Sequence, residues 1–278
     1  MSPSPGDVAL PDYPDAMKGK ELTAGVLGGM GPEATVDFMS KVIALTPAQE
    51  DQDHIRLIVD HNPKVPNRQA AILDGGEDPA PELAKMAQRL EKAGADFLVM
   101  VCNSAHAFLE VLRDATGLPF VSIIDVTIGE IKQKYPDARH TGVLATDGLL
   151  AAGIYQRALI EAGLVPVLPG EEELVRLMSL IGRIKKGDKS REVAQEMGAL
   201  AELLASAGAD VIIAGCTEIP LVLDGAKNTV PVVASTDALA RKTIALARGL
   251  EPLDPFVRPG TGHDQVRWRH SSASRNDG

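Results

Sequence analysis

The sequence predicts an α/β protein in which two pseudo-symmetric, Rossmann-like (flavodoxin-like) parallel-sheet domains face each other across a cleft. Two observations predict this class. Apolar residues make up 45% of the 278 residues but aromatic residues only 3%, which is typical of helices packed on parallel strands. Short apolar strands also alternate with amphipathic helices, and the whole succession occurs twice in the same order.

Each half begins with the same kind of segment. "TAGVLGGMGPEAT" at 23–35 and "HTGVLATDGLLAAG" at 140–153 both predict a short apolar strand, a loop of small residues and the start of a helix. The paired segments define where each sheet begins.

The middle of each half is more specific. "LAKMAQRLEKAGADFLVMVCNS" at 83–104 matches "MGALAELLASAGADVIIAGCTE" at 197–218. Each predicts an amphipathic helix that stops at Ala-Gly-Ala-Asp, then a buried strand, then a cysteine. These two cysteines are the only ones in the chain, and they occupy equivalent positions of the repeat.

A third pair, 117–125 and 228–237, completes the repeat with a short strand that leads into a helix. We therefore expect a first lobe over 21–120 and a second over 121–228. The ends, 1–20 and 251–278, are rich in proline or in small and charged residues. They predict a disordered arm and a flexible tail, because they have little apolar surface to offset the entropy of ordering.

The predicted architecture gives the cysteines a function. Ligands of open parallel sheets bind beyond the carboxyl ends of the strands, where Cys102 and Cys216 fall. Helix N-termini at that edge favour anions such as carboxylates, and they should lower the pKa of a cysteine from about 8.5. Two thiols on opposite sides of a small anion suit inversion of a stereocentre, because one removes the α-proton and the other returns a proton to the opposite face.

Charge and composition exclude several other classes. The formal net charge is −10, so no positive field collects nucleic acid. Asp96 and Asp210 interrupt the two most apolar runs, so we expect no membrane span. No signal peptide is evident, and two cysteines without secretion indicate reduced thiols, which together predict a cytoplasmic protein.

Four motifs follow one another along the chain: "GVLGGMGPEAT", "NPKVPNR", "CNSAHAF" and "AGCTEIPLVL". In this order they resemble the aspartate racemase branch of the aspartate/glutamate racemase superfamily, over roughly residues 21–250. The resemblance implies catalysis without pyridoxal phosphate, another cofactor or a metal, a homodimer, and a return of residues 229–250 to the first lobe. Glutamate racemases typically show "DSGVGG" and "CTH" where this chain has "GGMGPEAT" and "CTE", which favours aspartate.

The resemblance also assigns the site. Cys102 and Cys216 correspond to the paired acid/base residues, and Asn103, Ser104 and Thr217 to the residues that hold the α-carboxylate. The family more often has threonine at the position of Ser104, which keeps the hydroxyl.

Specificity for an acidic amino acid needs positive charge. Arg68 falls where the family places an arginine for the substrate carboxylate, and a guanidinium fork suits that task. Lys185 matches a family lysine near the distal carboxylate, with Lys186 as the alternative. Met30 in the first small-residue loop is a further substrate-binding candidate. Glu218 is another, which either contacts the substrate or orients Cys216.

Two other functions compete with this one. "GMGPEA", at 29–34, fits the dinucleotide fingerprint G-x-G-x-x-A after a strand, which would indicate an NAD(P)-dependent oxidoreductase. The acidic residue expected about twenty positions later would be Asp51 or Asp53, which precede the next strand instead of ending it. A non-catalytic protein that binds acidic amino acids would keep the same cleft. His106, four residues after Cys102, is interpreted as a helix-start histidine, because no third metal ligand lies at a useful spacing.

Overall fold

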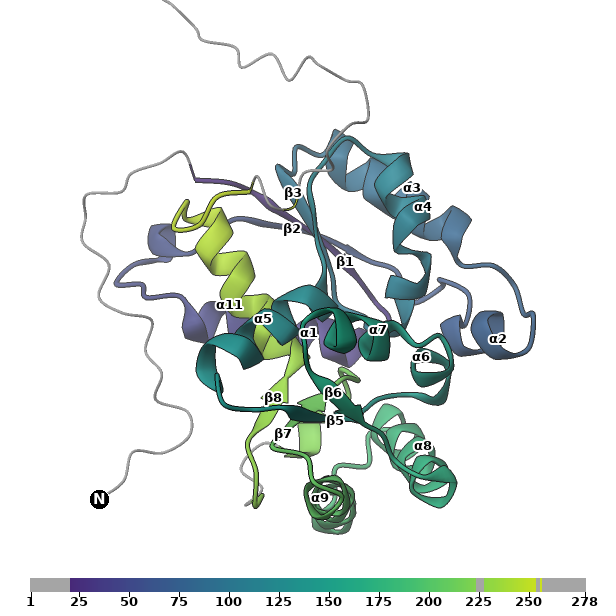
Figure 1. Ribbon diagram of the computed structural model, residues 1–278. Coiled ribbons are helices and arrows are strands. Elements are labelled where there is room, and N and C mark those ends of the chain that lie inside the picture. The colour runs from purple at the N-terminus through teal and green to yellow at the C-terminus, as the bar shows by residue number, and fades with distance from the viewer. Residues whose placement is uncertain (1–20, 224–227, 254–255, 257–278) are drawn as a thin grey trace, which may run out of the picture.

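The computed structural model describes residues 21–223, 228–253 and 256, and its strands form two four-stranded parallel sheets (Figure 1). The first sheet has the order β2-β1-β3-β4 and defines the first lobe; the second has the equivalent order β6-β5-β7-β8 and defines the second lobe. The first sheet contains β1 (Ala24–Gly28), β2 (Leu57–His61), β3 (Phe97–Met100) and β4 (Phe120–Val121). The second contains β5 (His140–Leu144), β6 (Val165–Val167), β7 (Val211–Ala214) and β8 (Val232–Ala234). The predicted fold class is confirmed.

The inner strands β1, β3 and β7 are buried on both faces, and alternate residues contribute to different cores. In β1, Val26 belongs to a central core, whereas Leu27 packs in the outer core of the first lobe. In β7, Ile213 belongs to the same central core and Ile212 to the outer core of the second lobe. This alternation is the period of two of a β-strand. One apolar core therefore runs between the two sheets and joins the lobes.

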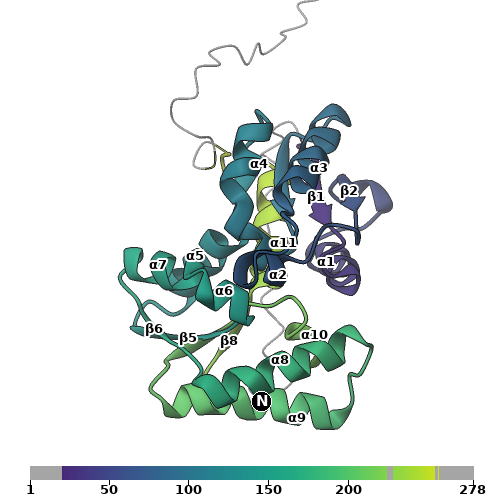
Figure 2. The same cartoon turned by 90° about the vertical axis from the view of Figure 1, so that its right-hand side faces the viewer.

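Helices form three layers around the two sheets. The central layer consists of α1 (Pro32–Leu45), α5 (Ile123–Lys134), α7 (Ile154–Glu161) and α11 (Ser235–Ala247). The outer layers are α3 (Ala80–Lys92) with α4 (Leu109–Ala115), and α8 (Glu171–Lys185) with α9 (Arg191–Ser206), as Figure 2 shows for the second lobe. The short elements are α2 (Arg68–Leu73), α6 (Asp147–Ala151), α10 (Pro220–Leu223), η1 (Asp51–Asp53) and η2 (Ser104–Phe108). No helix in the described ranges is long and apolar enough to cross a membrane.

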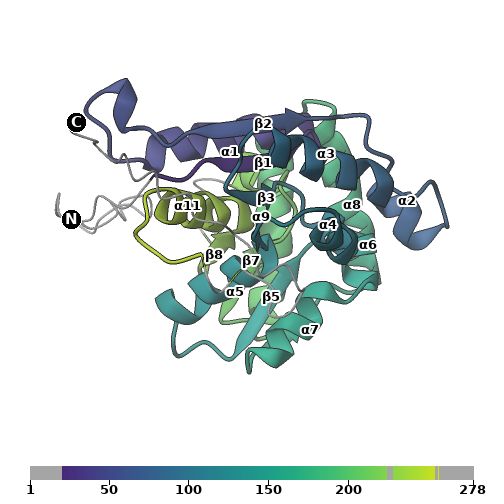
Figure 3. The ribbon, with the colours of Figure 1, turned by 90° about the horizontal axis from the view of Figure 1, so that it is seen from above.

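The helix after the fourth strand of each sheet crosses to the other lobe. After β4, α5 packs against α7 and β8; after β8, α11 packs against α1, and the two crossing helices lie side by side (Figure 3). The expectation that residues 229–250 return together to the first lobe is wrong for the strand. β8 pairs with β7 in the second sheet, so the chain returns one element later, with α11. The reason is that β8 is needed to complete the second sheet, as β4 completes the first.

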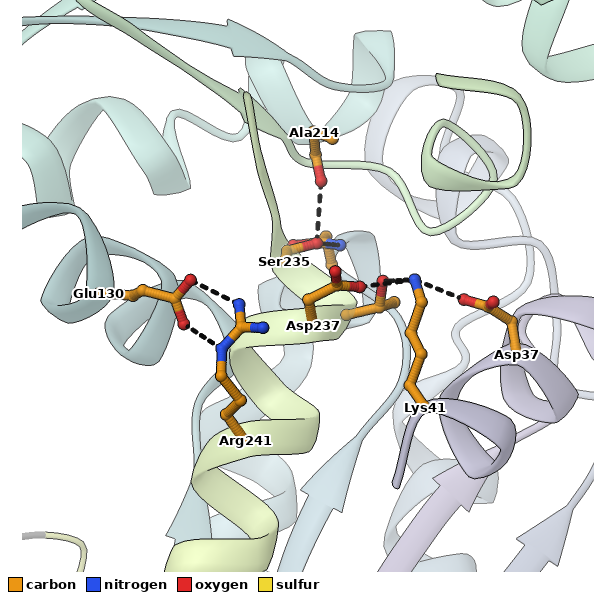
Figure 4. Close-up of polar contacts among 9 residues, drawn as sticks. Asp37, Lys41, Glu130, Ala214, Ser235, Asp237 and Arg241 are labelled. Atoms are coloured by element: carbon orange, nitrogen blue, oxygen red, sulfur yellow. Dashed lines mark hydrogen bonds and ion pairs between the residues drawn. The ribbon is translucent and has the colours of Figure 1, made fainter. Parts of the chain in front are cut away.

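Ion pairs hold α11 in this crossing position (Figure 4). Lys41 of α1 lies 2.6 Å from Asp237 of α11 and 2.8 Å from Asp37 of its own helix. Arg241 of α11 donates from Nε to Glu130 of α5 at 2.9 Å. Because these side chains are only partly exposed, the pairs are screened less than surface ion pairs, and they fix the crossing helices to each other.

The terminal predictions concern residues that are mostly outside the described ranges. The arm at 1–20 lies wholly outside them. In the predicted tail, residues 251–253 and 256 are described, and Leu253 and Phe256 pack against the central core.

Gly29, in the loop after β1, has a position that only glycine fits, and this gives a first prediction. Its φ is +90°, and a Cβ there would lie 2.4 Å from the backbone carbon of Asn62. Gly94 has a similar φ of +92° but open space around it. We expect Gly94→Ala to cost about 1–3 kcal/mol of unfolding free energy through backbone strain alone. Gly29→Ala should cost clearly more in urea denaturation, because the backbone of Asn62 must also move. Equal losses in the two variants would contradict the close approach at Gly29.

Candidate active site

A cleft with about 350 Å³ of empty space lies between the lobes, at the carboxyl ends of the strands. Its position is the one that open parallel sheets use for ligands. The residues of the first lobe that line it are Met30, Asn67, Arg68, Gln69, Cys102, Asn103 and Ser104. Those of the second lobe are Thr146, Lys185, Cys216, Thr217 and Glu218. The structure thus brings together every site residue named from the sequence.

The two cysteines reach the cleft from equivalent places. Cys102 comes two residues after the end of β3, and Cys216 two residues after the end of β7. Each side chain is almost buried, with 6% of its residue surface exposed. Both thiols are free of disulfide bonding. Two reduced thiols therefore enter one cleft from opposite lobes.

The surroundings of Cys216 differ from the sequence expectation. Its Sγ donates to Oε2 of Glu218 at 3.0 Å, and Glu218 is itself only 5% exposed. Burial and the Glu218 carboxylate raise the pKa of the Cys216 thiol well above its usual value, whereas Lys185 lowers it. The expected lowering by a helix N-terminus is wrong for this residue. The helix that follows, α10, spans only Pro220–Leu223, too short to outweigh burial and a neighbouring carboxylate.

Glu218 and Lys185 should shift the pH dependence in opposite directions, which gives a second prediction. Nζ of Lys185 lies 3.9 Å from Oε1 of Glu218, at the more exposed side of the pair. The role of base that the family resemblance implies for Cys216 needs a thiolate, so kcat/KM in the reaction direction that uses this base should fall as pH drops and the thiolate is protonated. Glu218→Gln removes a negative charge, so the apparent pKa of this limb should move down. Lys185→Gln removes a positive charge and should move it up.

Lys186→Gln removes a lysine that does not line the cleft, and it should leave the profile unchanged. An unchanged or higher apparent pKa in Glu218→Gln would mean that the carboxylate does not act on the Cys216 thiol.

A row of hydroxyl and amide groups occupies the cleft beside the thiols. Ser104 Oγ lies 3.0 Å from Oγ1 of Thr146, so these hydroxyls bridge the two lobes. Gln69 donates from Nε2 to Ser104 Oγ at 3.1 Å, and Thr217 donates from Oγ1 to Glu218. Such groups provide donors for an oxygen anion without adding charge.

Arg68 carries the positive charge that faces this row. Its Nη1 donates to the carbonyl oxygens of Val65 and Pro66 at 3.0 and 2.8 Å, which holds the guanidinium against its own loop. Its Nε is buried and has no hydrogen-bond partner among the described residues. Because Arg68 lines the cleft, its unpartnered Nε–H is a candidate donor to a bound carboxylate.

Asn103 and His106 have their polar atoms occupied by the protein. Tyr155 donates from its hydroxyl to Oδ1 of Asn103 at 2.8 Å, and Nδ2 of Asn103 donates to Ser235 at 3.0 Å. The backbone N–H of Ile123 donates to Nε2 of His106, so the Nδ1–H of the ring donates to the carbonyl of Cys102. Burial lowers the pKa of His106 to about 4 and keeps the ring neutral. His106 thus braces the Cys102 loop against the start of α5.

Sequence reasoning missed Asn67, Gln69 and Thr146. Asn67 caps α2 by accepting from the backbone N–H of Gln69 and Ala70, so it positions Arg68 at the helix start. The repeat could have indicated Thr146, because it aligns this residue with Gly29, and both lie in the loop after the first strand of a sheet. Gln69 directly follows Arg68, but nothing in the sequence indicates its contact with Ser104.

The sequence model of the Asp/Glu/hydantoin racemase family matches residues 27–243, which include both cysteine loops. The chain belongs to this family. The resemblance stated from the motifs is therefore confirmed, and the enzyme class that membership indicates is an isomerase, a racemase.

Individual relatives agree with the family assignment. The broad specificity amino-acid racemase RacX of Bacillus subtilis is 30% identical over 80% of this chain and 96% of its own length. A solved structure of Picrophilus torridus aspartate racemase has a TM-score of 0.73 and 27% identity, covering 81% of this chain and 94% of that one. An aspartate racemase homologue from Pyrococcus horikoshii has a TM-score of 0.67 and 28% identity, covering 81% and 98%.

The dinucleotide fingerprint has a different explanation in the structure. Gly31 of the "GMGPEA" loop faces Glu218 of the other lobe, because a Cβ on Gly31 would lie 2.9 Å from Oε1 of that carboxylate. The loop therefore closes on an acidic side chain, which would repel a pyrophosphate.

Proposed function

We propose that this racemase interconverts L- and D-aspartate without a cofactor, by proton transfer between Cys102 and Cys216. The observation that carries the proposal is that the two cysteines of the chain line one cleft from opposite lobes, at equivalent positions of an internal repeat. Neither a non-catalytic binding protein nor an NAD(P)-dependent oxidoreductase requires two thiols placed in this way.

In the proposed proton transfer, the proton that one cysteine takes up is matched by the proton that the other cysteine gives. One cysteine, as thiolate, takes the α-proton from Cα and becomes a thiol. The opposite cysteine, as thiol, gives its proton to the other face of the resulting carbanion and becomes a thiolate. The product is the mirror image of the substrate, and the two sulfurs have exchanged protonation states.

The polar groups of the cleft support an acidic substrate. We propose that the hydroxyls of Ser104, Thr146 and Thr217 turn from one another and from Glu218 when substrate enters, and donate to the α-carboxylate, whose negative charge increases as the α-proton leaves. The side-chain carboxylate would bind the Nε–H of Arg68, with Lys185 adding positive charge at the rim. Aspartate is proposed as that acid because "GGMGPEAT" and "CTE" match the aspartate branch.

A circular-dichroism assay of both enantiomers of aspartate, glutamate and alanine, without added cofactor, tests the proposal. We expect both aspartate enantiomers to lose optical activity, with the highest kcat/KM of the three amino acids. Equal rates on all three would replace aspartate racemisation by a broad specificity. Aspartate binding by calorimetry without any α-proton exchange would make the protein a non-catalytic binder and refute the proposal.

A further inference from the structure

A buried line of hydrogen bonds connects the two lobes next to the thiols. Tyr155 of α7 donates to Asn103 at 2.8 Å, Asn103 donates to Ser235 at 3.0 Å, and Ser235 donates to the carbonyl oxygen of Ala214 at 3.0 Å. None of the four residues is more than 2% exposed. We call the residues Tyr155, Asn103, Ser235 and Ala214 the strut; Figure 4 shows its last step, from Ser235 to Ala214.

The part of the strut from Asn103 to Ala214 connects the two cysteine loops. Asn103 directly follows Cys102, and Ala214 precedes Cys216 by two residues. Ser235 is the first residue of α11, the helix that crosses from the second lobe back to the first. Two hydrogen bonds, through Ser235, thus connect the backbone carbonyl of Ala214, just before Cys216, with the side chain of Asn103, just after Cys102.

The donors of the strut form one consistent set of directions. The Ser235 hydroxyl gives its proton to Ala214, so it must accept from the amide of Asn103. That amide then presents its oxygen to Tyr155, whose hydroxyl stays protonated because burial raises its pKa. In a buried setting, loss of any one bond leaves an unpaired polar group, so the arrangement is either complete or strongly disfavoured.

The internal repeat shows that the fold itself does not need such a connection. Thr217 holds the position equivalent to Asn103, and its hydroxyl bonds to the neighbouring Glu218 instead of the other lobe. The strut is therefore a feature of one cysteine loop and not of the α/β unit. Asn103 was expected to bind the α-carboxylate, but its oxygen and one of its amide hydrogens are already used here.

We propose that Tyr155, Asn103 and Ser235 are positioning residues that fix the distance and orientation between the Cys102 and Cys216 thiols. This inference rests on the proposed two-thiol racemisation. The carbanion must receive a proton from the far thiol before the near thiol returns one, so a displacement of about 1 Å can lower the rate on the order of 100-fold.

Tyr155→Phe and Ser235→Ala test the inference, because each removes only a hydroxyl. Thr243→Val is the matched control. Thr243 is a fully buried residue of α11 whose hydroxyl bonds to Leu239 of its own helix at 2.7 Å. We expect kcat on aspartate to fall about 10- to 100-fold in the two strut variants, with KM changed less than about twofold. The control should keep kcat within about twofold of the wild type.

Heavy water supplies a readout that a general loss of stability would not change. If the far thiol is displaced, the near thiol holds the abstracted proton long enough to exchange it with solvent and then returns deuterium to the same face. The strut variants should therefore gain deuterium in the recovered starting enantiomer for each inversion, relative to wild type and control. The double variant should be no slower than the slower single variant, because one broken connection already frees the loops.

Failure of the strut inference and failure of the proposed function give different results. If both single variants keep kcat within about twofold of the control, or lose kcat without added deuterium in the starting enantiomer, the strut does not position the thiols. If Tyr155→Phe does not fold, as judged by urea denaturation, Ser235→Ala decides alone. If the wild type itself does not racemise aspartate, it is the proposed function that fails.

Discussion

Cys102→Ser and Cys216→Ser should each abolish racemisation, with kcat lowered at least about 10³-fold. A serine hydroxyl keeps its proton near neutral pH far more firmly than a thiol, whose reference pKa is about 8.5. It therefore cannot act as the base, and the remaining thiol reaches only one face of the substrate. The loss should appear with both enantiomers, measured by circular dichroism.

Folding is the necessary control for the cysteine variants. Serine is nearly isosteric with cysteine, but both sites are almost buried, so we expect a modest fall of the urea midpoint with the fold retained. By family resemblance Cys216 faces the α-proton of the L-enantiomer and Cys102 that of the D-enantiomer. In heavy water each variant should therefore keep slow α-proton exchange on the enantiomer that its remaining thiol faces. Full racemase activity in either variant would contradict the two-thiol mechanism.

Arg68→Ala should lower kcat/KM for aspartate by about 30- to 1000-fold, corresponding to about 2–4 kcal/mol. The Nε–H donor of the guanidinium is then lost as a partner for the side-chain carboxylate. Alanine has no such carboxylate, so its kcat/KM should fall far less. The experiment compares the two substrates within the same variant.

Arg68 also holds its loop through the carbonyls of Val65 and Pro66, and the substrate comparison separates this contribution. Loop loosening should affect aspartate and alanine alike. Arg56→Ala, which removes an exposed arginine outside the cleft, should change neither substrate. Equal losses on aspartate and alanine in Arg68→Ala would mean that the arginine is structural.

The repeat made much of the fold predictable from sequence. Equivalent strands at 23–35 and 140–153, and equivalent helix-strand-cysteine segments, predict two sheets of the same order with the cysteines at the same edge. The pairing of 228–237 with 117–125 in the repeat indicated that Val232–Ala234 completes the second sheet, against the return implied by family resemblance. The crossing of the next helix was not predictable from the repeat, because only the long-range packing of α11 against α1 reveals it.

The local electrostatics of the site were also beyond the sequence. The position of Cys216 before a helix suggested a lowered pKa, but the length of α10 and the fold of Glu218 back onto Sγ are tertiary facts. Tyr155 is another example. It stands in a helix whose sequence is that of an ordinary amphipathic segment, and its bond to Asn103 depends on the packing of α7 against α5.

Deuterium incorporation during the first inversions in heavy water tests the two-thiol account most directly. Wild-type protein is given L-aspartate, and the early D-aspartate and the remaining L-aspartate are analysed separately by mass spectrometry. The account predicts that every D-aspartate molecule carries one solvent deuterium at Cα while the remaining L-aspartate carries almost none, because different thiols remove and return the proton. D-aspartate that retains the original proton would mean that a single base carries it across both faces, and would contradict the account.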